Sequence, residues 1–207
     1  MLFKSHFQTQ LNKKIKECDS CSLCKNSGPV LGYGSLDAAV MFIADAPEPK
    51  EARTGIPFIG KAKEKMMHAV TINNLKKGDY YFTYLIKHSL GKATTINSDA
   101  ETRCIDLLVE EIELVNPRII VSMGFSVTKQ LIKHYKLKEL EVLKLKDMHG
   151  NGYIIPAVIK HKKMRRQKRY LIPTWSPCID DFVMNDQFKL DVATVGSVRN
   201  LGILLYD

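Results

Sequence analysis

The sequence predicts a three-layer α/β/α domain with a central, mostly parallel four-stranded sheet. The apolar runs of this chain lack the polar alternation of half-exposed strands, which is typical of parallel strands buried on both faces. Segments with helical periodicity separate them, as the crossover between two parallel strands requires. At 207 residues and 45% hydrophobic content, without an internal repeat or a linker, the chain is expected to form one domain over 1–207.

The expected strands are short and β-branched or aromatic in composition. They span Ala38–Ala44, Tyr80–Ile86, Arg118–Met123 and Tyr170–Ile172. Tyr153–Ile159 and Tyr170–Ile172 flank a basic loop.

The expected helices show apolar residues at helical spacing. Ser98-Asp-Ala-Glu101 is a capping-box pattern that opens one of them, and Asn116-Pro117 ends it. The others span Met1–Glu17, Lys61–Ile72, Ser126–Tyr135 and Gln187–Leu204.

Three loops follow the carboxyl ends of expected strands, where open α/β sheets place their functional residues. They are Ala44–Gly60, Lys87–Asn97 and Thr174–Phe182.

The positive charge of the chain is concentrated in one segment. Lysine and arginine number 31 against 22 acidic residues, a net charge of +9. Lys160–Arg169 holds seven of the basic residues and no acid, so the remainder is nearly neutral. Such a run is either solvated surface or a contact for nucleic-acid phosphates. We expect a basic insertion at about 160–169 that contacts nucleic-acid phosphates through Lys160, Lys162, Lys163, Arg165, Arg166, Lys168 and Arg169.

No apolar run reaches the roughly 18–20 residues that a membrane-spanning helix requires. The amino-terminal segment is lysine-rich and lacks the apolar core of a secretory signal. Clustered thiols without export fit a reducing, intracellular compartment, so we expect a cytoplasmic protein without a membrane partner.

Four of the five cysteines indicate a metal centre. Cys18, Cys21 and Cys24 follow one another at C-x-x-C spacing, and Cys104 lies on the helix that begins at Ser98. This spacing places thiolates on one side of a tight turn, as an iron–sulfur cluster or a zinc ion requires. The pattern alone does not distinguish the two metals.

Taken together and in order, these segments resemble the family 4, iron–sulfur uracil-DNA glycosylases. Met41–Gly60 resembles the family's strand followed by G-E-x-P-G and T-G-x-P-F-V-G, and Tyr81–His88 resembles Y-I-T-N-x-x-K-C. Pro173-Thr-Trp-Ser-Pro177 stands where the family has P-T-x-H-P. The resemblance extends from Cys18 to the final helix. It implies that the protein is a monomer and that DNA is its partner. Replication or repair proteins are further expected partners.

The resemblance implies a 4Fe–4S cluster, with structural zinc as the alternative. Cys18, Cys21 and Cys104 match three of the family's four cysteines, and His88 stands at the third position, sixteen residues before Cys104. Histidine can ligate either metal. Cys24 is the alternative fourth ligand.

The resemblance also implies the catalytic and base-binding residues. Asp45 stands at the family's motif glutamate, Glu51 at a second acidic position, and Phe58 at the aromatic on which a flipped uracil stacks. Breaking an N-glycosidic bond through a cation-like sugar requires a carboxylate of this kind.

Two positions that bind the base depart from the family. Tyr84 replaces the asparagine that pairs with the uracil edge, and its ring can fill the pocket. Ser176 replaces the histidine that stabilises the departing uracil, and a serine carries no positive charge. We therefore expect a DNA-binding member of the superfamily that is inactive on uracil. The alternative is an active glycosylase that excises uracil or another damaged base.

Overall fold

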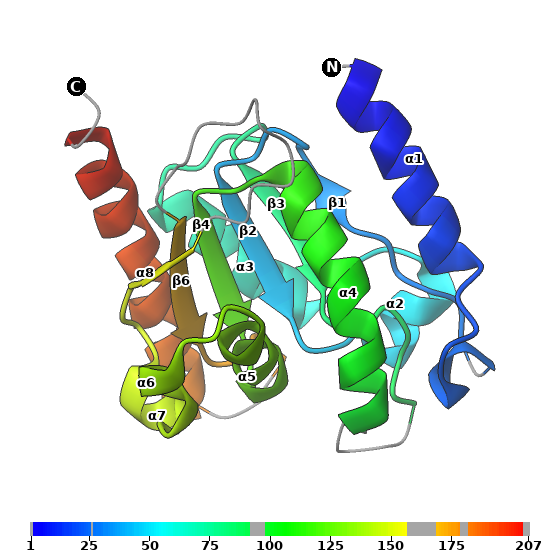
Figure 1. Ribbon diagram of the computed structural model, residues 1–207. Helices are drawn as coiled ribbons and strands as arrows, with labels where there is room; N and C mark the ends of the chain where they lie inside the picture. The colour runs from blue at the N-terminus through cyan, green and yellow to red at the C-terminus, as the bar shows by residue number, and fades with distance from the viewer. Residues whose placement is uncertain (1, 26, 92–97, 157–168, 179–181, 205–207) are drawn as a thin grey trace.

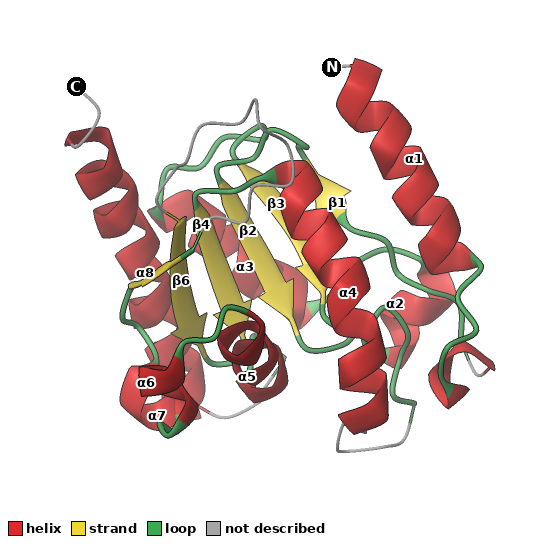
Figure 2. Ribbon diagram, viewed as in Figure 1, coloured by secondary structure: helices red, strands yellow, loops and turns green. Residues whose placement is uncertain are grey.

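A computed structural model describes residues 2–25, 27–91, 98–156, 169–178 and 182–204. Figure 1 and Figure 2 show one sheet with helices on both faces, the architecture that the sequence predicts. The strands lie in the order β1-β3-β2-β4-β6-β5. Their bounds are β1 Tyr33–Gly34, β2 Val40–Ala44, β3 Tyr80–Tyr84, β4 Ile119–Met123, β5 Tyr153–Ile155 and β6 Arg169–Thr174.

The four central strands, β3, β2, β4 and β6, are all parallel to one another. They are the four-stranded parallel sheet expected from the buried apolar runs. The observed sheet has six strands because β1 pairs antiparallel with β3 and β5 pairs antiparallel with β6. These edge strands span only two and three residues, which is too short to produce a clear apolar pattern in the sequence.

The long helices agree closely with the expected segments, and α3 has the predicted bounds. Four short helical elements in the loops were not expected. The helices are α1 Leu2–Lys16, the 3₁₀ helix η1 Ser22–Lys25, α2 Pro49–Thr54, α3 Lys61–Ile72, α4 Ser98–Val115, α5 Phe125–His134, α6 Lys138–Glu141, α7 Leu145–Met148 and α8 Phe182–Leu204.

The helices bury a separate apolar core on each face of the sheet. One core joins α3 and α8 to Val40, Phe42 and Ala44 of β2, and the other joins α4 and α5 to Met41 and Ile43 of the same strand. Successive side chains of a strand point to opposite faces, so every position of β2 is buried. Figure 1 shows α4 in front of the sheet and α3 and α8 behind it.

The amino-terminal segment is fastened to the rest of the chain by polar contacts. Lys14 of α1 pairs with Glu110 of α4 at 2.7 Å. After α1, the backbone amide of Val30 donates to the carbonyl of Lys87 at 2.8 Å. The residues between α1 and β1 therefore lie beside the carboxyl end of β3. Among the described residues, no helix is long and apolar enough to cross a membrane.

Candidate functional site

The carboxyl ends of the four parallel strands meet along one edge of the sheet. Asp45 follows β2, Tyr84 ends β3, Gly124 follows β4 and Trp175 follows β6. The backbone connects these ends directly, because Gly124 N–H donates to the Thr174 carbonyl and Ile86 N–H donates to the Asp45 carbonyl, both at 2.9 Å. The fold thus gathers the three loops that the sequence singled out.

Asp45 lies at the amino-terminal end of α5. Its Oδ1 accepts a hydrogen bond from Val127 N–H at 2.7 Å, where the helix dipole favours a negative charge. The backbone of Gly124 lies against the same carboxylate, because a Cβ at position 124 would overlap Asp45 Oδ2. Burial raises the pKa of Asp45 to about 6, and the charge of Glu101 acts in the same direction. Among the described residues, no hydrogen bond engages Oδ2, so this oxygen can accept one from water.

Glu51 is fully buried and holds a loop together. With Glu48 it forms a capping box at the start of α2. Its Oε2 accepts hydrogen bonds from Glu48 N–H at 2.8 Å and Tyr84 O–H at 2.9 Å, and its Oε1 accepts one from Ile59 N–H at 3.1 Å. Burial raises its pKa, although these three hydrogen bonds oppose the shift. The Glu51 carboxylate thus has no exposed surface and three internal donors, which hold the loop in place.

The ring of Tyr84 lies flat against the ring of Phe58. Their centroids are 4.8 Å apart and their planes differ by 16°. The phenol oxygen accepts a hydrogen bond from Phe58 N–H at 3.0 Å while it donates to Glu51. Burial, together with the Glu51 carboxylate, raises the pKa of Tyr84, so the phenol stays protonated and can donate. Phe58 and Tyr84 are both buried and belong to the apolar core on the α3 side of the sheet.

Ser176 lies in the loop after β6 and makes a local contact. Its Oγ accepts a hydrogen bond from Cys178 N–H at 3.3 Å. It is half-buried and forms a turn within the motif that resembles P-T-x-H-P.

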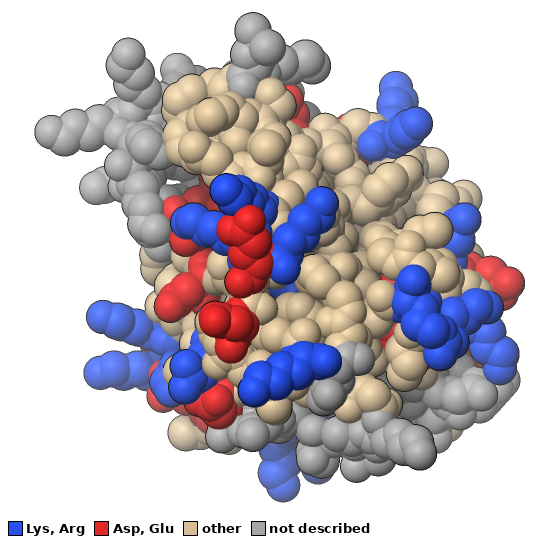
Figure 3. All heavy atoms as spheres, turned by 90° about the vertical axis from the view of Figure 1, so that its right-hand side faces the viewer, with Lys and Arg blue, Asp and Glu red and all other residues tan. Residues whose placement is uncertain are grey.

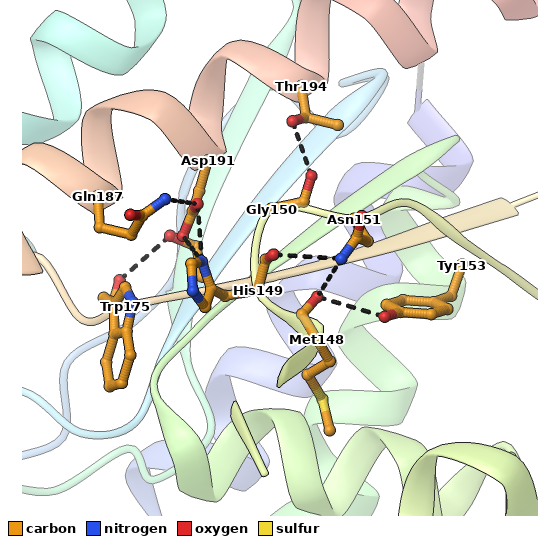
Figure 4. A network of polar contacts seen from close by, with 10 residues as sticks. Met148, His149, Gly150, Asn151, Tyr153, Trp175, Gln187, Asp191 and Thr194 are labelled. Carbon is orange, nitrogen blue, oxygen red and sulfur yellow. Dashed lines mark hydrogen bonds and ion pairs between the residues drawn. The ribbon is translucent and has the colours of Figure 1, made fainter. Parts of the chain in front are cut away.

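A histidine–aspartate pair lies beside that same loop (Figure 4). His149 Nδ1 lies 2.9 Å from Asp191 Oδ1, and Gln187 Nε2 donates to the same oxygen at 3.1 Å. The ring of His149 is centred 5.5 Å from the ring of Trp175. The sequence did not reveal this pair, because Asp191 is 42 residues from His149 and belongs to an ordinary helical pattern.

The cysteine motif and His88 come together beside the end of β3. Cys24 Sγ lies 3.7 Å from Cys21 Sγ, 4.0 Å from Cys18 Sγ and 3.8 Å from His88 Nδ1. Cys104 is buried nearby, where burial raises its pKa to about 11 and the Cys21 and Cys18 thiols add to the shift. These contacts are pairwise: among the described residues, no group of three or more His, Cys, Asp or Glu side chains is already arranged to hold a metal ion.

The comparison with known protein families decides where this arrangement belongs. The model of the uracil DNA glycosylase superfamily matches residues 31–178, most of the chain. The chain belongs to the uracil-DNA glycosylase superfamily. It is similar to three proteins named type-4 uracil-DNA glycosylase, from Pyrobaculum aerophilum, Thermotoga maritima and Archaeoglobus fulgidus. The identities are 30%, 25% and 28%, over 70%, 71% and 68% of this chain and 72%, 78% and 70% of the relatives.

The superfamily match covers the carboxyl edge of the sheet and begins after the cysteine motif. It includes Asp45, Tyr84 and Ser176, whereas Cys18, Cys21 and Cys24 precede residue 31. The matched region therefore contains the residues at the sheet edge, and it leaves out the three cysteines of the amino-terminal motif.

The resemblance implied a 4Fe–4S cluster, and the chain departs from the family at one of the ligand positions. Such a cluster is held by four cysteine thiolates that surround it, and position 88 is a histidine. Moreover, Cys24 Sγ lies within 4.0 Å of Cys18, Cys21 and His88. Cys24 therefore lies among the expected ligands, at the place of the alternative fourth ligand.

The basic insertion gives one correction. Lys160, Lys162, Lys163, Arg165, Arg166 and Lys168 lie outside the described residues. Arg169, expected to contact DNA, is the first residue of β6 and is 2% exposed. Its guanidinium donates to the Pro117 carbonyl at 3.0 Å and to Asn116 Oδ1 at 2.9 Å. The basic pattern in the sequence runs past the end of the loop into the strand, so its last arginine is a core residue.

Proposed function

We propose that this chain is an intracellular DNA-binding protein of the uracil-DNA glycosylase superfamily that does not excise uracil. One observation carries the proposal: the ring of Tyr84 lies parallel to Phe58 at 4.8 Å. The relatives are named for acting on uracil in DNA. In the family resemblance, Phe58 is the aromatic on which the flipped base stacks, and Tyr84 lies on that ring.

The tyrosine is held firmly in this place. Its hydroxyl group both donates to Glu51 and accepts from Phe58 N–H, so its hydrogen-bonding capacity is used. Moving the ring aside to admit a base would leave the buried Glu51 oxygen and Phe58 N–H without that partner, which costs about 1–3 kcal/mol for each group. Base flipping already costs a few kcal/mol of unstacking, so the two costs add.

Two further positions disfavour action on uracil. Glu51 has no exposed surface, and Ser176 donates no positive charge to a departing base. A filled base pocket and the lack of a group to stabilise the uracil anion support a role in DNA binding without uracil chemistry.

The charge distribution supports DNA as the partner. The net charge is +9, and seven of the basic residues fall in Lys160–Arg169. Figure 3 shows the face that carries α1, where basic and acidic side chains occur together between broad neutral areas. Phosphate contacts release counterions and therefore favour a concentrated basic segment.

A second candidate function is excision of a different damaged base. It is favoured by Asp45, whose Oδ2 accepts no hydrogen bond among the described residues and whose pKa near 6 leaves it largely ionised at neutral pH. Such a carboxylate can position water and stabilise a cation-like sugar.

One paired experiment tests both candidates. Fluorescence anisotropy measures binding of the full chain to single- and double-stranded oligonucleotides, with and without uracil or deaminated purines. The same samples are then treated with alkali to reveal abasic sites. We expect salt-sensitive binding to all of these DNAs without strand breaks.

If the wild-type chain produces strand breaks and Asp45→Asn does not, the proposed binding function is wrong and the second candidate function is supported. Absence of binding to any of the DNAs would contradict both.

A further inference from the structure

Cys24 is the common neighbour of the other potential ligands. The three separations that join it to Cys21 Sγ, Cys18 Sγ and His88 Nδ1 are 3.7, 4.0 and 3.8 Å. A tetrahedral zinc ion with Zn–S bonds of about 2.3 Å holds its sulfur atoms about 3.8 Å apart, because a tetrahedron's edge is about 1.6 times its centre-to-corner distance. The spacing around Cys24 therefore matches the ligand spacing of one small tetrahedral ion.

Two rigid parts of the chain bring these four side chains together. Cys24 lies on η1, where its amide donates to the Cys21 carbonyl at 3.3 Å, so one turn presents both sulfurs. His88 comes from the opposite side, from the segment that follows β3. Ser89 N–H donates to Ser27 Oγ at 3.1 Å, which fastens the two segments to each other next to the group.

Cys104 takes a different place. It is 4% exposed and packs within the core on the α4 side of the sheet. Within the described part of the chain, none of the sulfur contacts within 4.0 Å involves Cys104. Cys18, Cys21 and Cys24 are half-buried, so the three thiols of the motif are more accessible to an incoming ion than Cys104 is.

We propose that Cys18, Cys21, Cys24 and His88 bind a single tetrahedral ion of the zinc class. This Cys3His site replaces the cluster, with Cys24 as the fourth ligand and Cys104 as a core residue. The four groups now meet in pairs around Cys24, so binding the ion requires their side chains to shift onto one centre. The ion ties the end of α1 to the end of β3. This inference is independent of the proposed DNA-binding function.

Metal content and ligand substitution test the site in the full-length protein. The chain is expressed with both iron and zinc supplied, and the bound metal is measured by mass spectrometry. We expect a colourless protein with one zinc per chain. Cys24→Ser should lose the zinc, whereas Cys104→Ser and the matched control Cys178→Ser should keep it.

Cobalt substitution tests the ligand set without depending on a damaged fold. The Co²⁺ protein should show the intense visible bands of a tetrahedral thiolate site. His88→Cys retains four ligands, so it should still bind Co²⁺, with its bands moved to longer wavelength because thiolate is a weaker-field ligand than imidazole.

Three results would each overturn the proposal. One is a brown protein that contains iron and acid-labile sulfide. The second is loss of zinc in Cys104→Ser with retention in Cys24→Ser. The third is a metal-free protein in which mass spectrometry finds a Cys21–Cys24 disulfide.

Discussion

At the scale of single residues, Tyr84 connects the base-binding position to the core. Its hydroxyl group contacts Glu51 Oε2 and Phe58 N–H, and its ring covers Phe58. The sequence showed that an asparagine had become a tyrosine, and side-chain size alone indicated that the ring can fill the pocket. The sequence could not show that Glu51 turns inward to receive the phenol, since that contact joins residues 33 positions apart.

Tyr84→Phe tests how firmly this ring is held. The variant keeps the ring but leaves the Glu51 oxygen and the Phe58 amide short of a partner, so the free energy of unfolding should fall by about 1–3 kcal/mol. Urea unfolding monitored by circular dichroism measures the change. Tyr33→Phe, on an exposed ring, is the matched control and should change stability by less than about 0.5 kcal/mol. Equal effects of the two substitutions would show that the phenol contacts do not hold Tyr84.

Asp45 should make stability depend on pH in a defined direction. Its pKa rises from 3.8 to about 6 on folding, so between those values the folded state binds more protons than the unfolded state. Stability therefore falls as the pH rises from about 4 to 6, by about 2–3 kcal/mol from this group, and is level above that range.

Asp45→Asn should remove that fall, as measured by urea unfolding at a series of pH values. Asp37→Asn is the control, because the hydrogen bond from Lys4 lowers the pKa of Asp37 and gives it the opposite dependence. An unchanged pH profile in Asp45→Asn would show that another group titrates in this range.

At the scale of secondary-structure elements, a buried ion pair joins the segment after β3 to α4. Lys87 Nζ lies 2.6 Å from Glu111 Oε2, and both side chains are 1% exposed. Glu111 also accepts hydrogen bonds from Tyr81 O–H at 2.8 Å and Thr83 O–H at 2.7 Å. The pair thus fixes the end of β3, which carries Tyr84, against the helix on the other face of the sheet.

Lys87→Met leaves the Glu111 carboxylate buried and uncompensated, so it should destabilise the fold by about 3–5 kcal/mol. Adding Glu111→Gln should recover part of the lost stability. The double variant should therefore be destabilised by less than the sum of the two single destabilisations. Thermal and urea unfolding measure the cycle. The exposed pair Lys14–Glu110 provides the comparison, with an expected coupling of at most about 1 kcal/mol. Equal coupling in the two pairs would contradict the role of burial.

The elements themselves were largely predictable, and the exceptions have local causes. The four central strands are buried on both faces, so their apolar composition indicated them directly, and α3 was predicted to the residue. The edge strand β1 has two exposed residues, and α2 owes its start to a capping box formed by two glutamates. Neither feature produces a periodic apolar pattern, so neither could be found from the sequence.

The sequence indicated the site residues that lie in one continuous loop. It did not indicate contacts between segments that are far apart in the chain. Asp45 and Phe58 were expected from a continuous motif, and they lie beside the ends of β2 and β3, while their catalytic and base-binding roles stay predictions. The His149–Asp191 pair joins α8 to the segment after α7, and a periodic pattern gives no sign of such a contact. Arg169 was misassigned because a run of basic residues does not reveal where the strand begins.

At the scale of the whole molecule, DNA affinity should depend on the basic segment. Replacing the six basic residues of 160–168 with glutamine should weaken binding and flatten the plot of log affinity against log salt. The slope falls by about 0.9 for each lost phosphate contact on duplex DNA, and by about 0.7 on a single strand. Arg169 is left intact because it is buried.

The control for this experiment removes the same charge from elsewhere on the surface. It replaces six exposed lysines: Lys13, Lys14, Lys16, Lys76, Lys77 and Lys138. Equal losses of slope in both variants would show that net charge, and not the segment, determines binding.

The central claim, that Tyr84 occupies the base-stacking position and prevents uracil excision, is tested most directly by single-turnover release of uracil. The full chain, in excess over a single-stranded oligonucleotide with one uracil, is incubated and the free base is quantified. The account predicts no release above a protein-free control. Uracil release by the wild-type chain that is lost in Asp45→Asn would contradict it.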